Sequence, residues 1–275
     1  MNKKLIVVIV IVIGVAVLLV NNFIKKYEGN TISVSGTIEA TEVHLSFQVG
    51  GKITEMLKKE GDIVKTGEIM ARLDKEELSK MINQAEASLQ EAKFNYERMK
   101  EDYNRMENLF QSGAVPAQQR DTLKTNFEAA GKRVDTLQAT LDLARIKLNY
   151  TDLVSPIDGF VTVKSAEIGE IVQVGTTIFT ISDLKNIWVT GYIKETDLGR
   201  VKLNQKAKVK TDTYPDKEYI GYVSFISPES EFTPKQIQTQ EERINRVYRI
   251  KISVDNTNME LKTGMPVDAY IVPEK

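Results

Sequence analysis

Two short stretches of this chain match each other without a gap: VGGKITEMLKKEGDIVKTG at residues 49–67 and IDGFVTVKSAEIGEIVQVG at residues 157–175. The offset is 108 residues, as Gly159 minus Gly51 shows, and apolar positions keep the same register. Glycines at fixed spacing between β-branched segments predict strands joined by turns that need a positive φ or a close backbone approach. The half-motif turn glycines are Gly51, Gly61 and Gly67 in the first copy and Gly159, Gly169 and Gly175 in the second.

Each copy, at about 30 residues, is too small to bury the surface that an independent β unit needs. We therefore expect the two copies to pack face to face as one β-sandwich, built from residues 31–74 and 151–183. The segment that separates the copies has a different period, so the expected fold class is mixed α and β.

Residues 75–150 predict two long helices, because glycine almost disappears and apolar residues recur at alternating spacings of four and three. Asp74 followed by Glu77 indicates a capping box, and Ser112 with Gly113 indicates the turn between the two arms. We therefore predict an antiparallel coiled-coil hairpin. Its seam consists of Leu78, Ile82, Ala85, Leu89, Ala92, Tyr96, Met99, Tyr103, Met106 and Phe110 in the first arm, and of Leu123, Phe127, Ala130, Val134, Leu137, Leu141, Ala144 and Leu148 in the second, with Gly131 off the seam.

The N-terminus carries an apolar run that is long enough to cross a membrane. Residues 5–24, at about 1.5 Å each, span about 30 Å, which is the thickness of a hydrocarbon core. Residues 1–26 therefore predict a single-pass anchor in the inner membrane, with Lys3 and Lys4 inside the cell. A cleaved signal peptide is the alternative, but the run is not followed by a small-residue cleavage site.

The last third, residues 184–275, predicts a small β-barrel and a membrane-proximal region, because short alternating segments are separated by turn residues. Residues 229–245 are rich in Gln, Glu and Thr and predict a long loop.

Composition argues against several function classes. A net charge of −1 and a pI near 6.1 give no basic field of the kind that draws a protein onto nucleic acid. The absence of cysteine and the single histidine, His44, leave no catalytic set and no metal site, so we expect no enzyme and no cofactor. Four lysines near one barrel segment favour a solvated face over an anionic partner. They are Lys202, Lys206, Lys208 and Lys210.

Taken together, the order of these segments resembles the HlyD-type membrane fusion proteins, or periplasmic adaptors. The resemblance rests on residues 49–53 and 60–67 in the first copy, on residues 155–159 with Gly169 and Glu170 in the second, and on barrel segments such as residues 261–267. It implies an adaptor that self-associates into a ring and links an inner-membrane transporter to an outer-membrane channel of the TolC type, with its body in the periplasm. Residues 231–235 resemble a subgroup that is paired with ABC-type exporters.

The same resemblance implies that the hairpin tip docks on the channel through an arginine, a leucine four residues later and a hydroxyl residue seven beyond. Arg105 and Leu109 match, whereas Pro116 departs from the pattern because it offers no hydroxyl. Two other functions compete. Biotinyl and lipoyl carriers bear a lysine between the half-motifs, but Lys75 opens a predicted helix instead of an exposed turn. A membrane-tethered coiled-coil scaffold that binds a helical partner and takes no part in transport stays open as the alternative.

Overall fold

The computed structural model describes residues 31–232 and 246–272. The predicted anchor at residues 1–26 and most of the predicted loop at 229–245 lie outside the described residues. None of the described helices is both long and apolar enough to cross a membrane. The chain forms two compact units, one made of residues up to Glu42 together with residues from Ser182 onward, the other made of residues from Val43 to Ile181.

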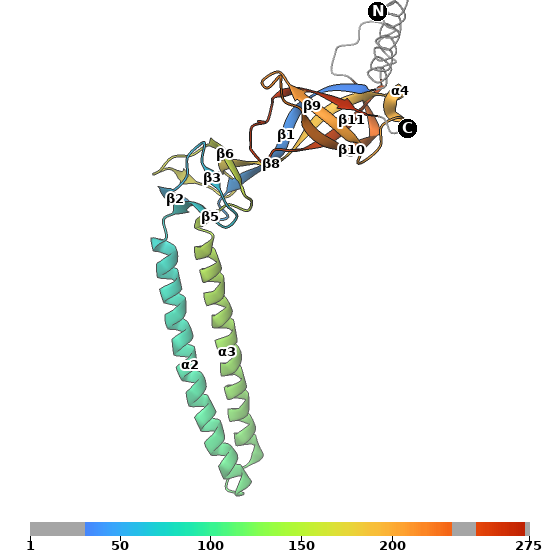
Figure 1. The fold of residues 1–275 in the computed structure, drawn as a ribbon. Helices are drawn as coiled ribbons and strands as arrows, with labels where there is room; N and C mark the ends of the chain where they lie inside the picture. Colours follow the sequence, from blue (N-terminus) through green and yellow to red (C-terminus); the bar gives the residue numbers. More distant parts are fainter. Residues whose placement is uncertain (1–30, 233–245, 273–275) are drawn as a thin grey trace, which may run out of the picture. The chain divides into compact units, whose positions relative to one another are not determined.

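The first unit is a closed β-barrel (Figure 1). Antiparallel neighbours follow the order β1, β12, β9, β10, β11 and β8, and β1 also pairs with β8, which closes the ring. A short helix, α4 (Glu195–Leu198), follows β8. β-Branched side chains from all six strands fill the interior. The strands are β1 (Ile32–Ser46), β8 (Thr177–Lys194), β9 (Lys206–Thr211), β10 (Tyr219–Phe232), β11 (Arg246–Asp255) and β12 (Pro266–Ile271).

The barrel uses residues that the sequence prediction had placed in the sandwich. The predicted sandwich begins at residue 31, but Ile32, Val34 and Ile38 lie in the barrel core, and β1 pairs with β12 from Ile32 to Thr37. That boundary is corrected to about residue 43. The error has a physical cause, because a strand that passes from one β domain into another keeps the same alternating pattern.

The second unit contains the two half-motifs, whose strands exchange hydrogen bonds. Ile53 donates its N–H to the Glu170 carbonyl at 2.8 Å and accepts from the Gly169 N–H at 2.9 Å. Displaced by 108 residues, Val161 bonds in the same way to Asp62 and Gly61, at 2.9 and 3.0 Å. Each copy therefore supplies backbone hydrogen-bond partners to the other. The strands are β2 (Gly51–Met56), β3 (Ile63–Val64), β4 (Ile69–Leu73), β5 (Asp152–Val154), β6 (Gly159–Lys164) and β7 (Ile171–Val172).

The predicted turn glycines fall into two groups. Four of them adopt positive φ values between 81° and 95°, as tight turns require: Gly61, Gly67, Gly169 and Gly175. Gly51 and Gly159 do not sit in turns but open strands β2 and β6. A Cβ at Gly51 would lie 3.3 Å from Leu73 Cδ1, so this glycine permits close packing.

Two long helices, α2 (Glu76–Gln111) and α3 (Ala117–Asn149), separate the half-motifs in the sequence and lie side by side in the structure (Figure 1). Every residue of the apolar seam is buried or half-buried. The predicted capping box forms only in part. Asp74 accepts a bond from the Glu76 N–H at 2.8 Å, but the Asp74 N–H donates to the Lys52 carbonyl instead of to Glu77.

Candidate functional site

The tip of the hairpin carries the residues that were predicted to dock on a channel. Arg105 and Leu109 lie one turn apart on α2, and Pro116 immediately precedes α3. The Arg105 side chain is 69% exposed and forms an ion pair with Asp102, while Leu109 is 46% exposed. A cation and an apolar side chain are thus both accessible near the end of the insertion.

A tight turn joins the helices at this tip. Gly113 has a φ of 77°, which side-chain-bearing residues rarely adopt. Its N–H donates to the Phe110 carbonyl, and the Ala114 N–H donates to the Leu109 carbonyl, each at 3.0 Å. These bonds satisfy carbonyls at the end of α2. Pro116, with a φ of −75°, then leads into α3.

Arg120 of α3 contacts residues at the end of α2, across the turn. Its guanidinium lies 4.6 Å from the Phe110 ring centroid, 3.5 Å from the Glu107 carboxylate and 2.7 Å from the Asp121 carboxylate. The side chains of Arg120 and Glu107 are 26% and 27% exposed, so this ion pair is partly desolvated, whereas Asp121 is 61% exposed. The sequence does not predict this role of Arg120, because the pattern within each arm does not give the register between the arms.

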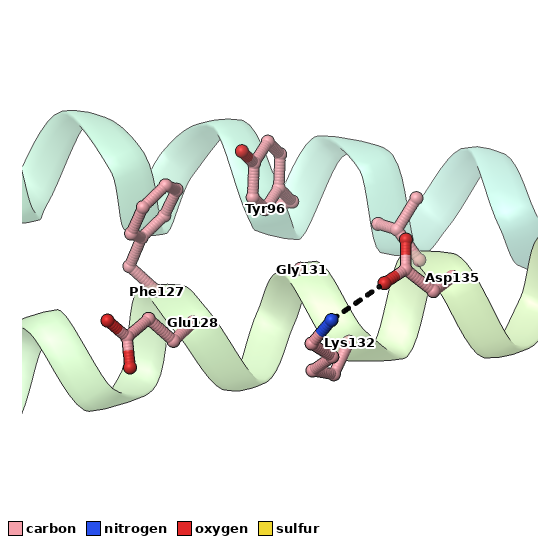
Figure 2. Close-up of a pocket in the computed structure, with 7 residues that line it drawn as sticks. Tyr96, Phe127, Glu128, Gly131, Lys132 and Asp135 are labelled. Atoms are coloured by element: carbon pink, nitrogen blue, oxygen red, sulfur yellow. Dashed lines mark hydrogen bonds and ion pairs between the residues drawn. The ribbon is translucent and has the colours of Figure 1, made fainter.

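An aromatic cluster holds the middle of the hairpin. Phe127 of α3 stacks against two tyrosines of α2, with ring centroids 5.1 Å from Tyr96 and 5.8 Å from Tyr103. Figure 2 shows Tyr96 beside Gly131, where a Cβ would lie 3.3 Å from the ring. Glycine costs about 1 kcal/mol relative to alanine in a helix, and here it makes room for Tyr96. The shallow depression at this point is therefore a packing feature of the hairpin.

Asp152 ties the base of the hairpin to the sandwich. Its carboxylate lies 2.7 Å from the Lys75 Nζ and 3.4 Å from the Arg72 Nε. Lys75 directly precedes α2 and is held by this ion pair, whereas a carrier lysine must stand free in an exposed turn. The geometry therefore favours a structural role for Lys75. Asp152 itself was not predicted, since its partners are distant in sequence.

The polar residues elsewhere form pairs instead of a reactive cluster. Within residues 31–232 and 246–272, no three side chains of the metal-ligating types gather at one point. His44 Nδ1 lies 3.1 Å from the Thr180 hydroxyl, which places the histidine in a contact between β1 and β8.

The predicted lysine cluster is placed on the barrel. Lys206, Lys208 and Lys210 alternate with buried residues along β9 and share its outer face, while Lys202 precedes that strand. Glu218 lies 2.9 Å from Lys208 and 3.0 Å from Lys210. Hydrogen bonds from these two lysines lower the pKa of the Glu218 carboxyl, and the bond to Glu218 raises the pKa of Lys210.

Two family models match this chain, one for each compact unit. The CzcB-like barrel-sandwich hybrid domain matches residues 41–183, which is more than half of the chain, and the YknX-like beta-barrel domain matches residues 187–271.

Similar proteins extend over nearly the whole sequence. The chain is 29% identical to a UPF0194 membrane protein of Acidithiobacillus ferridurans, over 98% of this chain and 96% of that protein. It is 27% identical to a UPF0194 membrane protein of Enterobacter sp. (strain 638), over 94% of this chain and 96% of that protein. The solved membrane fusion protein Spr0693 from Streptococcus pneumoniae R6 has the same fold, with a TM-score of 0.70, 22% identity and coverage of 89% of this chain and 100% of that chain.

The barrel-sandwich hybrid domain interrupted by two long helices, followed in the same chain by the β-barrel domain, therefore identifies a member of the HlyD-type membrane fusion proteins, a family of adaptors that are not enzymes.

Proposed function

We propose that this protein is the periplasmic adaptor subunit of an export pump. In this proposal residues 1–26 anchor it in the inner membrane, and its body links an ABC-type transporter to an outer-membrane channel of the TolC type. Several copies assemble into a ring, because a pair of helices cannot enclose a duct alone. The proposed working parts are the anchor, the sandwich, the hairpin at residues 75–150 and the barrel with its membrane-proximal region at residues 184–275.

The observation that carries the proposal is the placement of the hairpin. Both helices leave the sandwich at one point, where the Leu73 N–H donates to the Thr151 carbonyl at 2.9 Å. The apolar seam is covered by the partner helix, so the insertion needs no other domain to bury it. At about 1.5 Å per residue, α2 is roughly 50 Å long. A self-supporting rod of this length suits a strut that reaches a distant partner.

The tip offers the contacts that such a strut requires. Arg105 supplies an accessible cation for a carboxylate on the partner, and Leu109 supplies an apolar side chain one turn away. Pro116 starts α3 without contributing a hydroxyl. We therefore propose docking by Arg105 and Leu109, with Pro116 fixing the backbone of the turn.

The test is export by cells that carry the full chain. Arg105→Glu is compared with Arg98→Glu, an exposed arginine two turns earlier on the same helix. We expect export to fall at least tenfold for Arg105→Glu and to stay near the native level for Arg98→Glu, with both variants present at equal amounts. Equal export by native protein and both variants would refute docking through the tip.

A second experiment identifies the partners directly. A photo-crosslinking residue replaces Arg105 in one variant and Lys202 in another. Capture of an outer-membrane channel from the tip and of an inner-membrane transporter from the barrel supports the bridge. Capture of a helical protein unrelated to transport, together with unchanged export, would instead favour the scaffold function.

A further inference from the structure

Three exposed apolar side chains form a row on the outer face of the barrel strand β10. Ile220 is 50% exposed, Tyr222 is 51% exposed and Phe225 is 38% exposed. Side chains of alternate residues share one face of a strand, which accounts for Ile220 and Tyr222. Phe225 is out of phase with them and would point into the barrel in a regular strand.

A β-bulge turns Phe225 outward. Val223 pairs with Ile252 and Phe225 pairs with Lys251, so two steps along β10 match one step along β11. Val223 and Ile252 are fully buried, whereas Phe225 joins the outer row. Bulges of this kind re-aim a side chain at the cost of local ladder bonds. Here the bulge places an aromatic ring on the surface beside Tyr222.

A lysine stands directly opposite each of these apolar residues. In the strand register, Ile220 pairs with Lys208, Tyr222 pairs with Lys206, and Phe225 pairs with Lys251. Lys208 forms an ion pair with Glu218, and Lys251 Nζ lies 4.2 Å from the Trp188 ring centroid. Among the described residues, no carboxylate lies within ion-pair distance of Lys206 or Lys251. The row therefore has Lys206 and Lys208 along its β9 edge and Lys251 beside Phe225 on its β11 edge, where Ser253 faces Tyr222.

Ile220 and Tyr222 lie near the middle of the barrel wall. Their neighbour Gly221 is linked to Ile32, at the N-terminal end of β1, by pairing through β9 and β12, and to Ile187, near the sandwich-side end of the barrel, by pairing through β11. β10 runs from this level toward the end at which the chain enters from its N-terminus, so Phe225 is the member of the row nearest to that end. Six residue steps separate Lys26 from Ile32, a reach of at most about 20 Å.

We infer that the outer face of β9, β10 and β11 is a membrane-contact surface that binds anionic phospholipid. Tyr222, Phe225 and Ile220 would enter the headgroup level, where amphipathic rings are favoured, and the flanking lysines would contact lipid phosphates. The inference rests on the anchor in the proposed function, because that anchor keeps the barrel within reach of the bilayer. An acidic protein surface is the competing occupant.

The test uses the full chain reconstituted into vesicles. The sequence contains no cysteine, so Tyr222→Cys accepts a single environment-sensitive dye. The control is Asn258→Cys, in the turn that follows β11 and outside the apolar row. Vesicles contain phosphatidylcholine with or without phosphatidylglycerol, and bromine-labelled acyl chains quench any dye that reaches them. We expect quenching at position 222 that requires phosphatidylglycerol, and none at position 258.

Charge removal gives a second readout without a label. Trp188 is the only tryptophan, and its ring lies under Lys251, so its quenching by brominated lipid reports contact of the same face. Each lysine near an anionic surface is worth about a fivefold change in binding. We expect Lys206→Gln to weaken the contact about fivefold, and Lys206→Gln with Lys251→Gln about 30-fold, while Lys59→Gln in the sandwich leaves it unchanged.

The outcomes separate this inference from the proposed function. A chain that does not float with vesicles lacks the anchor, which overturns both. A chain that floats but shows no quenching, or equal quenching without phosphatidylglycerol, overturns only the lipid contact. Protection of position 222 that appears only when the transporter is added overturns it in favour of an acidic protein surface.

Discussion

Replacing Gly36 with alanine should weaken the pairing of β1 with β8, which closes the barrel. Gly36 lies on β1 against β8, and a Cβ there would sit 2.2 Å from the Thr190 carbonyl oxygen and 2.9 Å from its carbonyl carbon. From the other strand, a Cβ on Gly191 would lie 2.4 Å from Val34 Cγ1. Non-bonded heavy atoms need about 3.5 Å, so alanine at position 36 must push the strands apart by roughly 1 Å.

We expect Gly36→Ala to lower stability by an amount at the upper end of the range that is typical when a side chain is enlarged in a packed core. Extra methyl groups in a tight core cost about 1–3 kcal/mol when neighbouring side chains can adjust. Here the blocking atom belongs to the backbone and cannot rotate away. Each β1–β8 hydrogen bond that lengthens adds about 1 kcal/mol. We therefore expect Gly36→Ala to lower the free energy of unfolding by about 3 kcal/mol or more.

Urea unfolding followed by Trp188 fluorescence measures this loss, because Trp188 lies on β8, two residues before Thr190. Gly199→Ala is the control within the same barrel, since Gly199 has a φ of −66° and no atom within 4 Å of the added Cβ. It should leave stability unchanged or raise it by about 0.5 kcal/mol. A decrease of less than about 1 kcal/mol in the free energy of unfolding of Gly36→Ala would show that the pairing of β1 with β8 does not require glycine at this position.

Three further predictions concern the hairpin, the sandwich and the barrel. Phe127→Ala should lower hairpin stability by about 3 kcal/mol by thermal circular dichroism, whereas Phe94→Ala, whose ring is 69% exposed, should have little effect; equal effects would contradict the stacked cluster. Gly61→Ala and Gly169→Ala should each cost about 1–2 kcal/mol in urea unfolding, since both have positive φ and open surroundings; a large inequality would argue against their equivalence. Burial and the bond to Glu260 raise the pKa of Tyr219 to about 12, so its contribution is complete below pH 10 and is lost as pH rises through 12. Urea midpoints of the native chain should therefore fall between about pH 10 and 12 relative to those of Tyr219→Phe, and parallel curves would exclude the effect.

The repeat and the hairpin could be predicted from the sequence because they depend on local rules. Glycine spacing marks turns wherever a positive φ is required, and a spacing of four and three marks a helix stripe whatever its partner is. The resemblance to adaptor proteins rests on the same turn residues, and the family models support it. The docking role of Arg105 and Leu109 stays a prediction, because both are simply exposed side chains in the absence of a partner.

Other features depend on contacts between distant residues, which periodicity does not encode. The barrel closes where Gly36 meets Thr190, and nothing near Gly36 distinguishes it from a strand glycine with free space. The bulge at Phe225 is equally hidden, since its position follows from the pairing with Lys251. Asp152 and Arg120 act on partners in other elements, so their roles emerge only from the folded chain.

The exchange of hydrogen bonds between the half-motifs explains why this fold tolerates so long an insertion. The bonds of Ile53 to Glu170 and of Val161 to Asp62 bind the copies to one another, so the connection between them need not hold them together. Loop-closure entropy rises by only about 0.6 kcal/mol for each doubling of length, so growth from a few residues to a hairpin of this size costs about 2–3 kcal/mol. Burial along the seam of α2 and α3 opposes that cost, at about 25 cal/mol for each Å² of apolar surface. Because the insertion stabilises itself, its length is free to follow the distance to a partner without weakening the sandwich that carries it.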